Sequence, residues 1–264
     1  MALIGPGIDY RAREVHERIA RDGEGDLIGW DFVDNDLKPF APDVDCPVQA
    51  CTAEGQRWRT NPARLLLGEA GASKLIVLRT KDGDRGALAA AIAFAARSPA
   101  RIVPMLAKGV ASAGGTPGPD WPIMIEAARR FSNLLFIVPA YGPPIEVPGF
   151  DNLPIGNLLV VSPVSAAGEV AEADLAAPRP AADIAVSVET PGGVAATDPL
   201  PDRADQAVAR VAALAARLLS ADPILDAHEL KRKILSLVQP LAGPAKGLAR
   251  AGWLADPRRH FWLE

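Results

Sequence analysis

Residues 74–106, KLIVLRTKDGDRGALAAAIAFAARSPARIVPML, decide the fold of this chain. The two ends of the stretch, residues 74–80 and 101–106, are short and mostly apolar, as in strands that are covered on both faces of a sheet. Between them, residues 86–97 have the length and the apolar spacing of a helix. A strand, a helix and a strand in this order predict a right-handed βαβ unit with two parallel strands.

The same alternation continues on both sides of this unit. Further strand-like runs lie at residues 1–4, 134–140, 158–165 and 183–188, and further helical patterns lie at residues 11–20 and 120–131. Together they predict an α/β fold whose mostly parallel sheet carries helices on both faces. Because the sequence contains no stretch typical of a domain linker, we expect one domain over residues 1–264.

The last third of the chain is expected to hold two helices. In residues 204–220, small and apolar side chains occupy most of the helix surface, which predicts a helix packed closely against the sheet. A second helix is expected to begin at Asp226, whose side chain can cap it together with Glu229, and to run to about residue 238. Stretches rich in proline and glycine predict long loops at residues 109–119, 142–149 and 190–201.

The composition is that of an average globular protein, with 49% hydrophobic and 23% charged residues, so a mainly disordered chain is excluded. The net charge of −4 provides no field that would hold nucleic acid or anionic lipid, and we expect neither as a partner. Three histidines and two cysteines leave little from which to build a metal site. The sequence shows no signal peptide and no apolar run of about 18 residues, so we expect a cytoplasmic protein.

Six segments in order along the chain resemble those of the subtilisin-like serine proteases, the subtilase family. Residues 2–10, ALIGPGIDY, are similar to the family's first strand and the turn that carries its catalytic aspartate. Residues 28–36, IGWDFVDND, are similar to the loop that precedes its histidine motif. The other four segments are residues 71–79, 89–96, 207–223 and 251–257. The resemblance covers nearly the whole chain and implies the family's three-layer α/β fold around a mostly parallel central sheet.

The positions that the resemblance assigns to the family's catalytic residues hold other residues. The positions of the aspartate, the histidine, the serine and the oxyanion-hole asparagine hold Gly5, Ala50, Asp205 and Gly142, respectively. A carboxylate, an imidazole and a hydroxyl are all needed for the triad chemistry. In subtilisin itself, loss of the triad costs about 10⁶ in turnover, and loss of an oxyanion donor roughly another 10²–10³. The resemblance therefore implies a pseudoprotease, in which Asp205 accepts amide hydrogens at a helix N-terminus.

A subtilase fold without its triad leaves three functions open. The segment that matches the family's substrate-binding edge could still pair its backbone with an extended peptide, and it consists of Met105, Leu106, Ala107, Lys108 and Gly109. The leading hypothesis is therefore a scaffold or binding subunit for a protein or peptide partner, such as an active relative. The alternatives are a serine hydrolase with residual or altered activity, and a purely architectural subunit of a larger complex.

Some remaining side chains suggest other chemistry. Cys46 and Cys51 share one short loop, where they form a disulfide in an oxidising compartment or remain thiols otherwise. Cys51 is also a candidate nucleophile, although no base is evident near it, because we expect His16, His228 and His260 to lie on the surface. Five carboxylates could bind calcium or form a solvated loop: Asp31, Asp34, Asp36, Asp43 and Asp45. Their spacing matches no EF-hand, and we expect no cofactor.

Overall fold

The strands of the computed structural model form a parallel sheet in two parts. The structure describes residues 1–10, 12–39, 62–107, 120–140, 155–165, 167–169, 182–188, 203–241 and 248–258. One part of the sheet has the order β1-β3-β2, with β1 at Ala2–Gly5, β2 at Gly29–Asp31 and β3 at Ile76–Arg79. The other part runs in the order β4-β5-β6-β7-β8, at Ile102–Pro104, Leu135–Pro139, Leu158–Val164, Ala182–Ser187 and Ala249–Leu254.

A short contact joins the two parts into one sheet. Ile4 of β1 forms a parallel bridge with Met105, directly after β4, and the Leu106 N–H donates to the Ile4 carbonyl at 2.9 Å. All strand pairs in the described residues are parallel. The carboxyl ends of β1, β3 and β4 therefore meet at one edge of the sheet.

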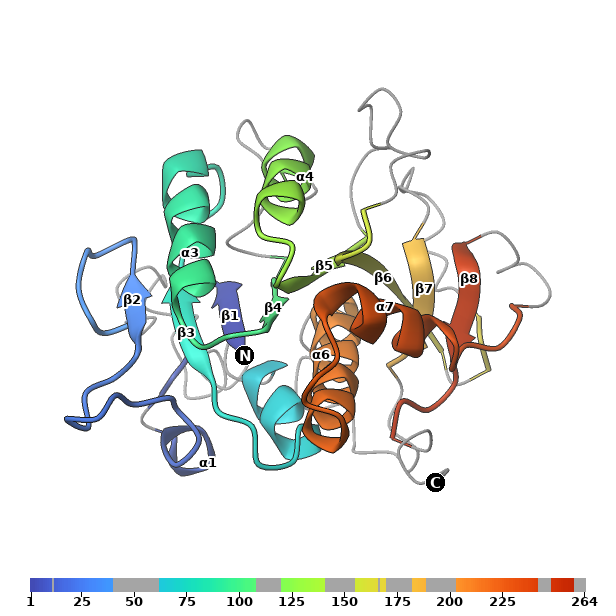
Figure 1. Ribbon diagram of the computed structural model, residues 1–264, viewed down its shortest axis with the longest axis horizontal. Coiled ribbons are helices and arrows are strands. Elements are labelled where there is room, and N and C mark those ends of the chain that lie inside the picture. Colours follow the sequence, from blue (N-terminus) through green and yellow to red (C-terminus); the bar gives the residue numbers. More distant parts are fainter. Residues whose placement is uncertain are drawn as a thin grey trace, which may run out of the picture.

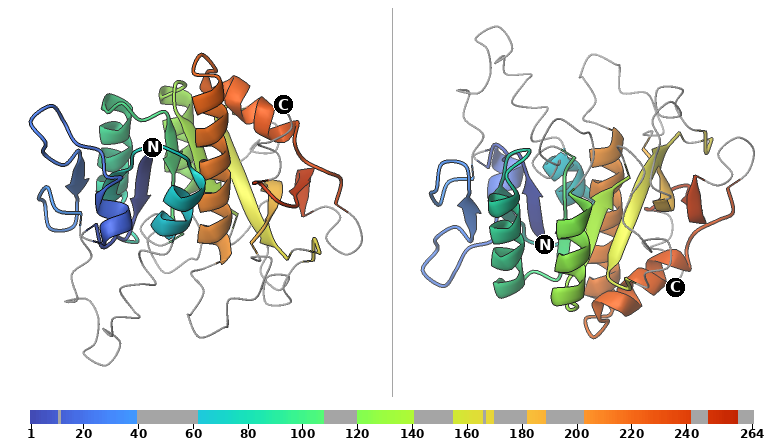
Figure 2. Two further views of the ribbon diagram at one scale, coloured as in Figure 1. Left: turned by 90° about the horizontal axis from the view of Figure 1, so that it is seen from below. Right: turned by 90° about the horizontal axis from the view of Figure 1, so that it is seen from above.

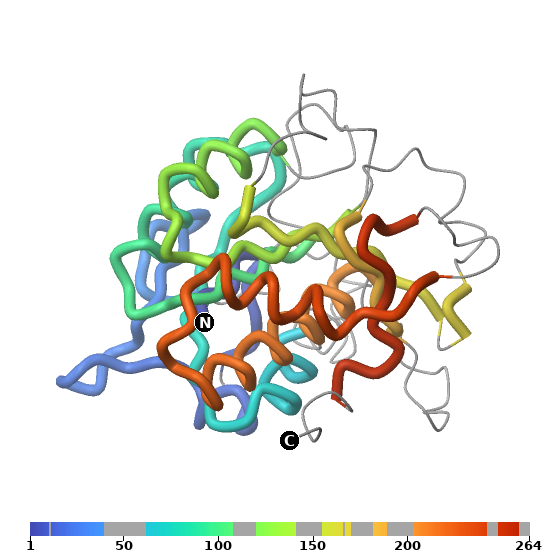
Figure 3. The backbone as a smooth tube through the Cα atoms, turned by 45° about the vertical axis from the view of Figure 1, so that its right-hand side comes forward, coloured from blue at the N-terminus to red at the C-terminus, as the bar shows by residue number. Residues whose placement is uncertain are grey.

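Helices cover both faces of this sheet. Helices α3 (Arg85–Arg97) and α4 (Trp121–Arg130) lie on one face, and α1 (Arg13–His16), the helical residues 62–69 and α6 (Arg203–Ala221) lie on the other (Figures 1 and 2). Helix α7 (Ala227–Leu235) follows α6 on the same face, where the two run in succession (Figure 3). The fold thus has the three layers that the sequence predicts, and the α/β prediction is confirmed.

The core is divided by the sheet into two apolar clusters. In β5, Leu135 and Ile137 point into the cluster beneath α6, whereas Phe136 and Val138 point into the cluster beneath α3 and α4. Alternating side chains of one strand thus face opposite layers, and all four are buried. This explains why the strands are apolar almost throughout.

Most predicted elements are present, and their ends differ from the prediction by one to a few residues. The prediction of a helix over residues 11–20 is wrong. Of residues 12–20, which the structure describes, only Arg13–His16 are helical. The next residues pair instead with the chain that leads into β3: the Leu75 N–H donates to Arg18 O at 2.9 Å, and the Ala20 N–H donates to Leu75 O at 2.8 Å. Tertiary hydrogen bonds therefore override the local helical pattern.

The predicted start of α7 is confirmed. Asp226 Oδ1 accepts the Glu229 N–H at 2.8 Å, and Glu229 Oε2 accepts the Asp226 N–H at 2.9 Å, which is a capping box. The helix ends at Leu235, earlier than the predicted residue 238. In the part of the chain that the structure describes, no helix is both long and apolar enough to span a bilayer.

Candidate functional site

The candidate site lies where the carboxyl ends of the parallel strands meet, the usual place for function in such sheets. Gly5 ends β1 and is paired in register with Arg79, the last residue of β3. The Leu106 N–H joins the chain after β4 to the carbonyl of Ile4. Asp205, in the first turn of α6, completes the group. The structure thus brings together Gly5 and Asp205, two of the positions that the resemblance singles out.

Leu106 fills the space beside Gly5. A Cβ atom added to Gly5 would lie 3.0 Å from Cδ1, 3.1 Å from Cβ and 3.2 Å from Cγ of Leu106. These distances are shorter than ordinary carbon–carbon contacts, so any side chain at this position would have to push Leu106 aside. The apolar side chain of Leu106 therefore occupies the space that the first atom of an aspartate side chain at position 5 would need.

Asp205 binds the backbone at the end of β4. Asp205 is only 6% exposed, and its Oδ1 accepts the Ala107 N–H at 2.6 Å. The amide that donates to Asp205 lies 98 positions away in the sequence, whereas the sequence predicts that Asp205 accepts amides at the N-terminus of its own helix, which stays a prediction. The bond ties the start of α6 to the chain that leaves β4.

The 105–109 segment is described only in its first three residues. The Met105 N–H donates to Ile137 O at 3.0 Å, and the Leu106 N–H donates to Ile4 O at 2.9 Å. Met105, Leu106 and Ala107 are all buried. Met105 and Leu106 therefore lie within the sheet, and a peptide could pair with the segment from Ala107 onward at the earliest. Lys108 and Gly109 lie outside the described residues.

Several other predicted residues also lie outside the described residues, namely Cys46, Ala50, Cys51, Gly142 and His260. The two histidines that the structure describes are placed apart from Asp205. His16 is the last residue of the short helix α1, with its Nε2 3.4 Å from an Arg21 guanidinium nitrogen. His228 lies on α7, beyond the far end of α6 from Asp205, and its ring stands over Gly156.

An ion pair that the sequence analysis did not predict lies at the same edge of the sheet. Arg79 Nη1 donates to Asp31 Oδ2 at 2.8 Å and to Asp34 Oδ2 at 2.5 Å, and the side chains of Arg79 and Asp31 are only 4% and 0% exposed. Burial favours a lower pKa for Arg79, but hydrogen bonds and charges from the two aspartates outweigh it and raise that pKa. The guanidinium therefore stays charged and holds the loop after β2 on the end of β3.

This ion pair changes the interpretation of the acidic loop. Asp31 and Asp34 face Arg79, while Asp36 Oδ1 accepts the Lys38 N–H at 2.7 Å. Asp43 and Asp45 lie outside the described residues. Within the described ranges, no group of three or more His, Cys, Asp or Glu side chains is placed to hold a metal ion.

A second buried group of charges lies behind α6. Arg210, which is 2% exposed, donates from Nη1 to Ser187 O at 2.9 Å, and its Nε lies 3.8 Å from Glu69 Oε1. Arg217 donates to the carbonyls of Glu69 and Pro257. Burial raises the pKa of the Glu69 carboxyl, and the charge of Arg210 offsets this only in part. Arg210 and Arg217 are the two polar residues in the apolar run 207–219 of α6, and they were the signal in the sequence for this group.

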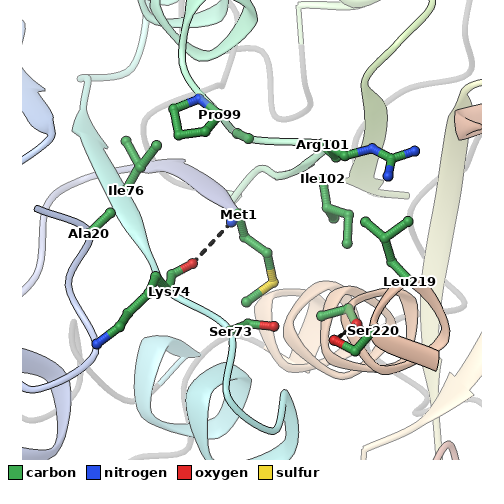
Figure 4. A pocket seen from close by; sticks show the side chains of 12 residues that line it. Met1, Ala20, Ser73, Lys74, Ile76, Pro99, Arg101, Ile102, Leu219 and Ser220 are labelled. Carbon is green, nitrogen blue, oxygen red and sulfur yellow. Dashed lines mark hydrogen bonds between the residues drawn. The ribbon is translucent and has the colours of Figure 1, made fainter. Parts of the chain in front are cut away.

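A cavity of about 380 Å³ lies at the opposite, amino-terminal edge of the sheet. Met1, Arg101 and Ser220 are among its lining residues, and Figure 4 shows the Met1 side chain extending into it. Two of the polar side chains that line the cavity bind nearby carbonyls: Arg101 donates to Pro223 O at 2.6 Å, and Ser220 donates to Ala216 O at 2.8 Å. The cavity is therefore separate from the candidate site.

Several solved structures with a similar fold are proteases. They include a lanthipeptide protease (TM-score 0.61, 14% identity, 96% of this chain and 84% of that chain covered). MycP1 from the ESX-1 type VII secretion system has a TM-score of 0.60 at 17% identity, with 100% and 80% covered. A cold-adapted subtilisin-like serine proteinase has a TM-score of 0.56 at 13% identity, with 90% and 81% covered. No family model and no curated protein matches the chain. The chain therefore has the subtilisin-like fold.

Proposed function

We propose that this chain is a catalytically inactive member of the subtilisin-like fold and serves as a scaffold or binding subunit for a protein or peptide partner. One observation carries the proposal. Gly5 and Asp205, which the resemblance places at the aspartate and serine of the triad, meet at one edge of the sheet. Between them stand the apolar side chain of Leu106 and the backbone of Ala107.

The chemistry of these residues supports inactivity. Glycine has no group that could orient an imidazole, and a buried carboxylate in place of the serine would repel a developing oxyanion. Asp205 is also engaged by the Ala107 N–H rather than directed at a substrate. Ala50 and Gly142, at the other two assigned positions, carry neither an imidazole nor an amide side chain.

A fluorophosphonate probe tests the proposed inactivity. We expect no labelling of the purified chain under conditions in which active subtilisin is labelled to completion. The physical reason is that loss of the triad lowers turnover by about 10⁶, as measured in subtilisin itself. Gel fluorescence gives the extent of labelling, and peptide mass spectrometry locates any label. A label mapped to a serine would contradict the proposal and favour the alternative of a hydrolase with altered activity.

The proposed partner is a protein, bound at the carboxyl edge of the sheet. One structural neighbour, MycP1, is described as an essential component of a type VII secretion system, which is a precedent for a subtilisin-like chain that works within a larger apparatus. We expect an amine-reactive cross-linker, applied to complexes isolated from the source cells, to join a partner to Lys81. Lys81 directly follows Thr80, whose N–H donates to the carbonyl of Gly5.

Lys74 provides the comparison position for this experiment, because it is also exposed but precedes β3 at the amino edge. Cross-links at Lys81 and not at Lys74 support binding at the candidate site. Cross-links at Lys74 alone favour the architectural alternative, in which the partner contacts another surface. If the purified chain retains no protein from the source cells, the proposed binding function as a whole is contradicted.

A further inference from the structure

The cavity at the amino-terminal edge of the sheet has the size and the walls of a small-molecule site. Its volume is about 380 Å³, within the range of pockets that hold small ligands. Ile76 of β3, Ile102 of β4 and Leu219 of α6 line it, and both isoleucines are buried. Because two packed strands and a long helix form these walls, the cavity does not need a ligand to take shape.

Arg101 places a fixed positive charge at this cavity. Its Nη1 donates to Pro223 O at 2.6 Å and its Nη2 donates to Leu225 O, so the guanidinium is held on the turn between α6 and α7. Of the five N–H donors of a guanidinium, these bonds use two. Both acceptors are neutral carbonyls, and no carboxylate among the described residues forms an ion pair with Arg101. Its charge is therefore not balanced by an acidic side chain.

The other groups at the cavity favour an anion over a cation. None of the lining residues that the structure describes is acidic. Lys74 Nζ donates to Glu17 O at 2.9 Å, and Figure 4 shows this side chain turned away from Arg101. The last turn of α6 presents the negative end of a helix dipole, equivalent to about half a charge, which the full charge of Arg101 exceeds. An anionic group is therefore favoured at Arg101, beside an apolar wall.

We propose that this cavity binds a small carboxylate with an apolar chain, of the class of a medium-chain fatty acid. The carboxylate pairs with Arg101, whose remaining N–H groups can donate to both of its oxygens. The chain lies against Ile76, Ile102 and Leu219, where it is removed from water. Because the two carbonyls already hold the guanidinium in place, little side-chain freedom is lost on binding. The site is separate from the carboxyl edge and does not depend on the function proposed there.

The test compares octanoate with octanol, which have the same chain but differ in the charge of the head group. Isothermal titration calorimetry of the full chain at pH 7 gives the two dissociation constants. We expect octanoate to bind at least about tenfold more tightly than octanol, because only the carboxylate forms charged hydrogen bonds with Arg101. Arg101→Gln should remove most of this difference. Arg97→Gln, at an exposed arginine that ends α3 outside the cavity, is the matched control and should leave the difference unchanged.

A second pair of variants tests the location of the site. Ala216 of α6 lines the cavity and is 4% exposed, so Ala216→Leu fills part of the space that the chain of the ligand needs. We expect this variant to weaken the binding of both octanoate and octanol by at least about tenfold. Ala221→Leu adds the same side chain at an exposed position at the end of α6, outside the cavity, and should leave both affinities unchanged.

Each outcome supports or overturns the proposal. A preference for octanoate that is lost in Arg101→Gln, together with weak binding by Ala216→Leu, supports it. Equal affinities of the wild type for octanoate and octanol overturn the role of Arg101, and undiminished binding by Ala216→Leu overturns the location. If the wild type binds neither compound, the proposal as a whole is overturned. If Arg101→Gln fails to fold, the comparison of the two compounds on the wild type and on the two leucine variants decides the question.

Discussion

Replacing Arg79 with leucine is expected to lower the free energy of unfolding by about 3–5 kcal/mol, the usual cost of removing one partner of a buried ion pair. Asp31 is fully buried, and Arg79 is the cation that binds its Oδ2, at 2.8 Å. Without the guanidinium, the buried carboxylate retains the N–H groups of Val33 and Asp34 at its Oδ1 but loses the cation at its Oδ2, which reduces stability. Urea denaturation at pH 7, followed by far-UV circular dichroism, measures the change.

Two variants accompany this measurement. Asp34→Asn removes the outer partner of Arg79, whose side chain is 52% exposed, and should cost less than about 1 kcal/mol because water screens this pair. Arg79→Lys keeps a positive charge but not the planar fork of donors, and should fall between the wild type and Arg79→Leu. A stability of Arg79→Leu within about 1 kcal/mol of the wild type would show that Arg79 is not needed to hold Asp31.

The sequence predicted the sheet well because each strand carries its own signal. Strands buried on both faces must be apolar almost throughout, and the run at residues 134–140 alone is enough to predict β5. The capping box of α7 is likewise local, since both of its hydrogen bonds join Asp226 to Glu229. The helix predicted at residues 11–20 failed because its outcome depended on Leu75, more than fifty positions away.

The sequence named two residues that meet at the candidate site but none of the contacts that they make. The resemblance singled out Gly5 and Asp205, and the structure places both at the carboxyl edge. That Leu106 fills the space at Gly5, and that Ala107 binds Asp205, depends on how distant segments meet, and a single sequence has no local signal for this. The ion pair of Arg79 could not be predicted for the same reason. An arginine at the end of a strand is expected to be exposed, and only the fold brings Asp31 beside it.

Replacing Arg210 with methionine is expected to lower the free energy of unfolding by about 3 kcal/mol. The change removes the donor to the carbonyl of Ser187, at the end of β7, and the cation that faces Glu69. Both groups would remain buried without these partners. Urea denaturation at pH 7 measures the loss. Arg129→Met, at an exposed position in the last turn of α4, is the matched control and should stay within about 0.5 kcal/mol of the wild type.

Glu69 makes the free energy of unfolding depend on pH, and its contribution decreases as the pH rises. Burial raises its pKa in the folded chain above the ordinary value of 4.5, so the folded state holds the proton more tightly than the unfolded state. The contribution of Glu69 to stability is therefore fully present below the ordinary pKa and is lost as the pH rises through the raised one. Glu69→Gln, which cannot ionise, should remove this slope and should cost little by itself at pH 7.

The double variant Arg210→Met/Glu69→Gln separates the two causes of the loss. If the buried charge of Glu69 accounts for most of the cost of Arg210→Met, neutralising it should restore a large part of the stability, and the two changes will not add. If the unpaired carbonyl of Ser187 accounts for most of it, the double variant will be as unstable as Arg210→Met alone. A steeper pH dependence in Arg210→Met than in the wild type would support the first explanation, because removal of the cation raises the pKa of Glu69 further. An unchanged pH dependence in Glu69→Gln would contradict the assignment of the slope to Glu69.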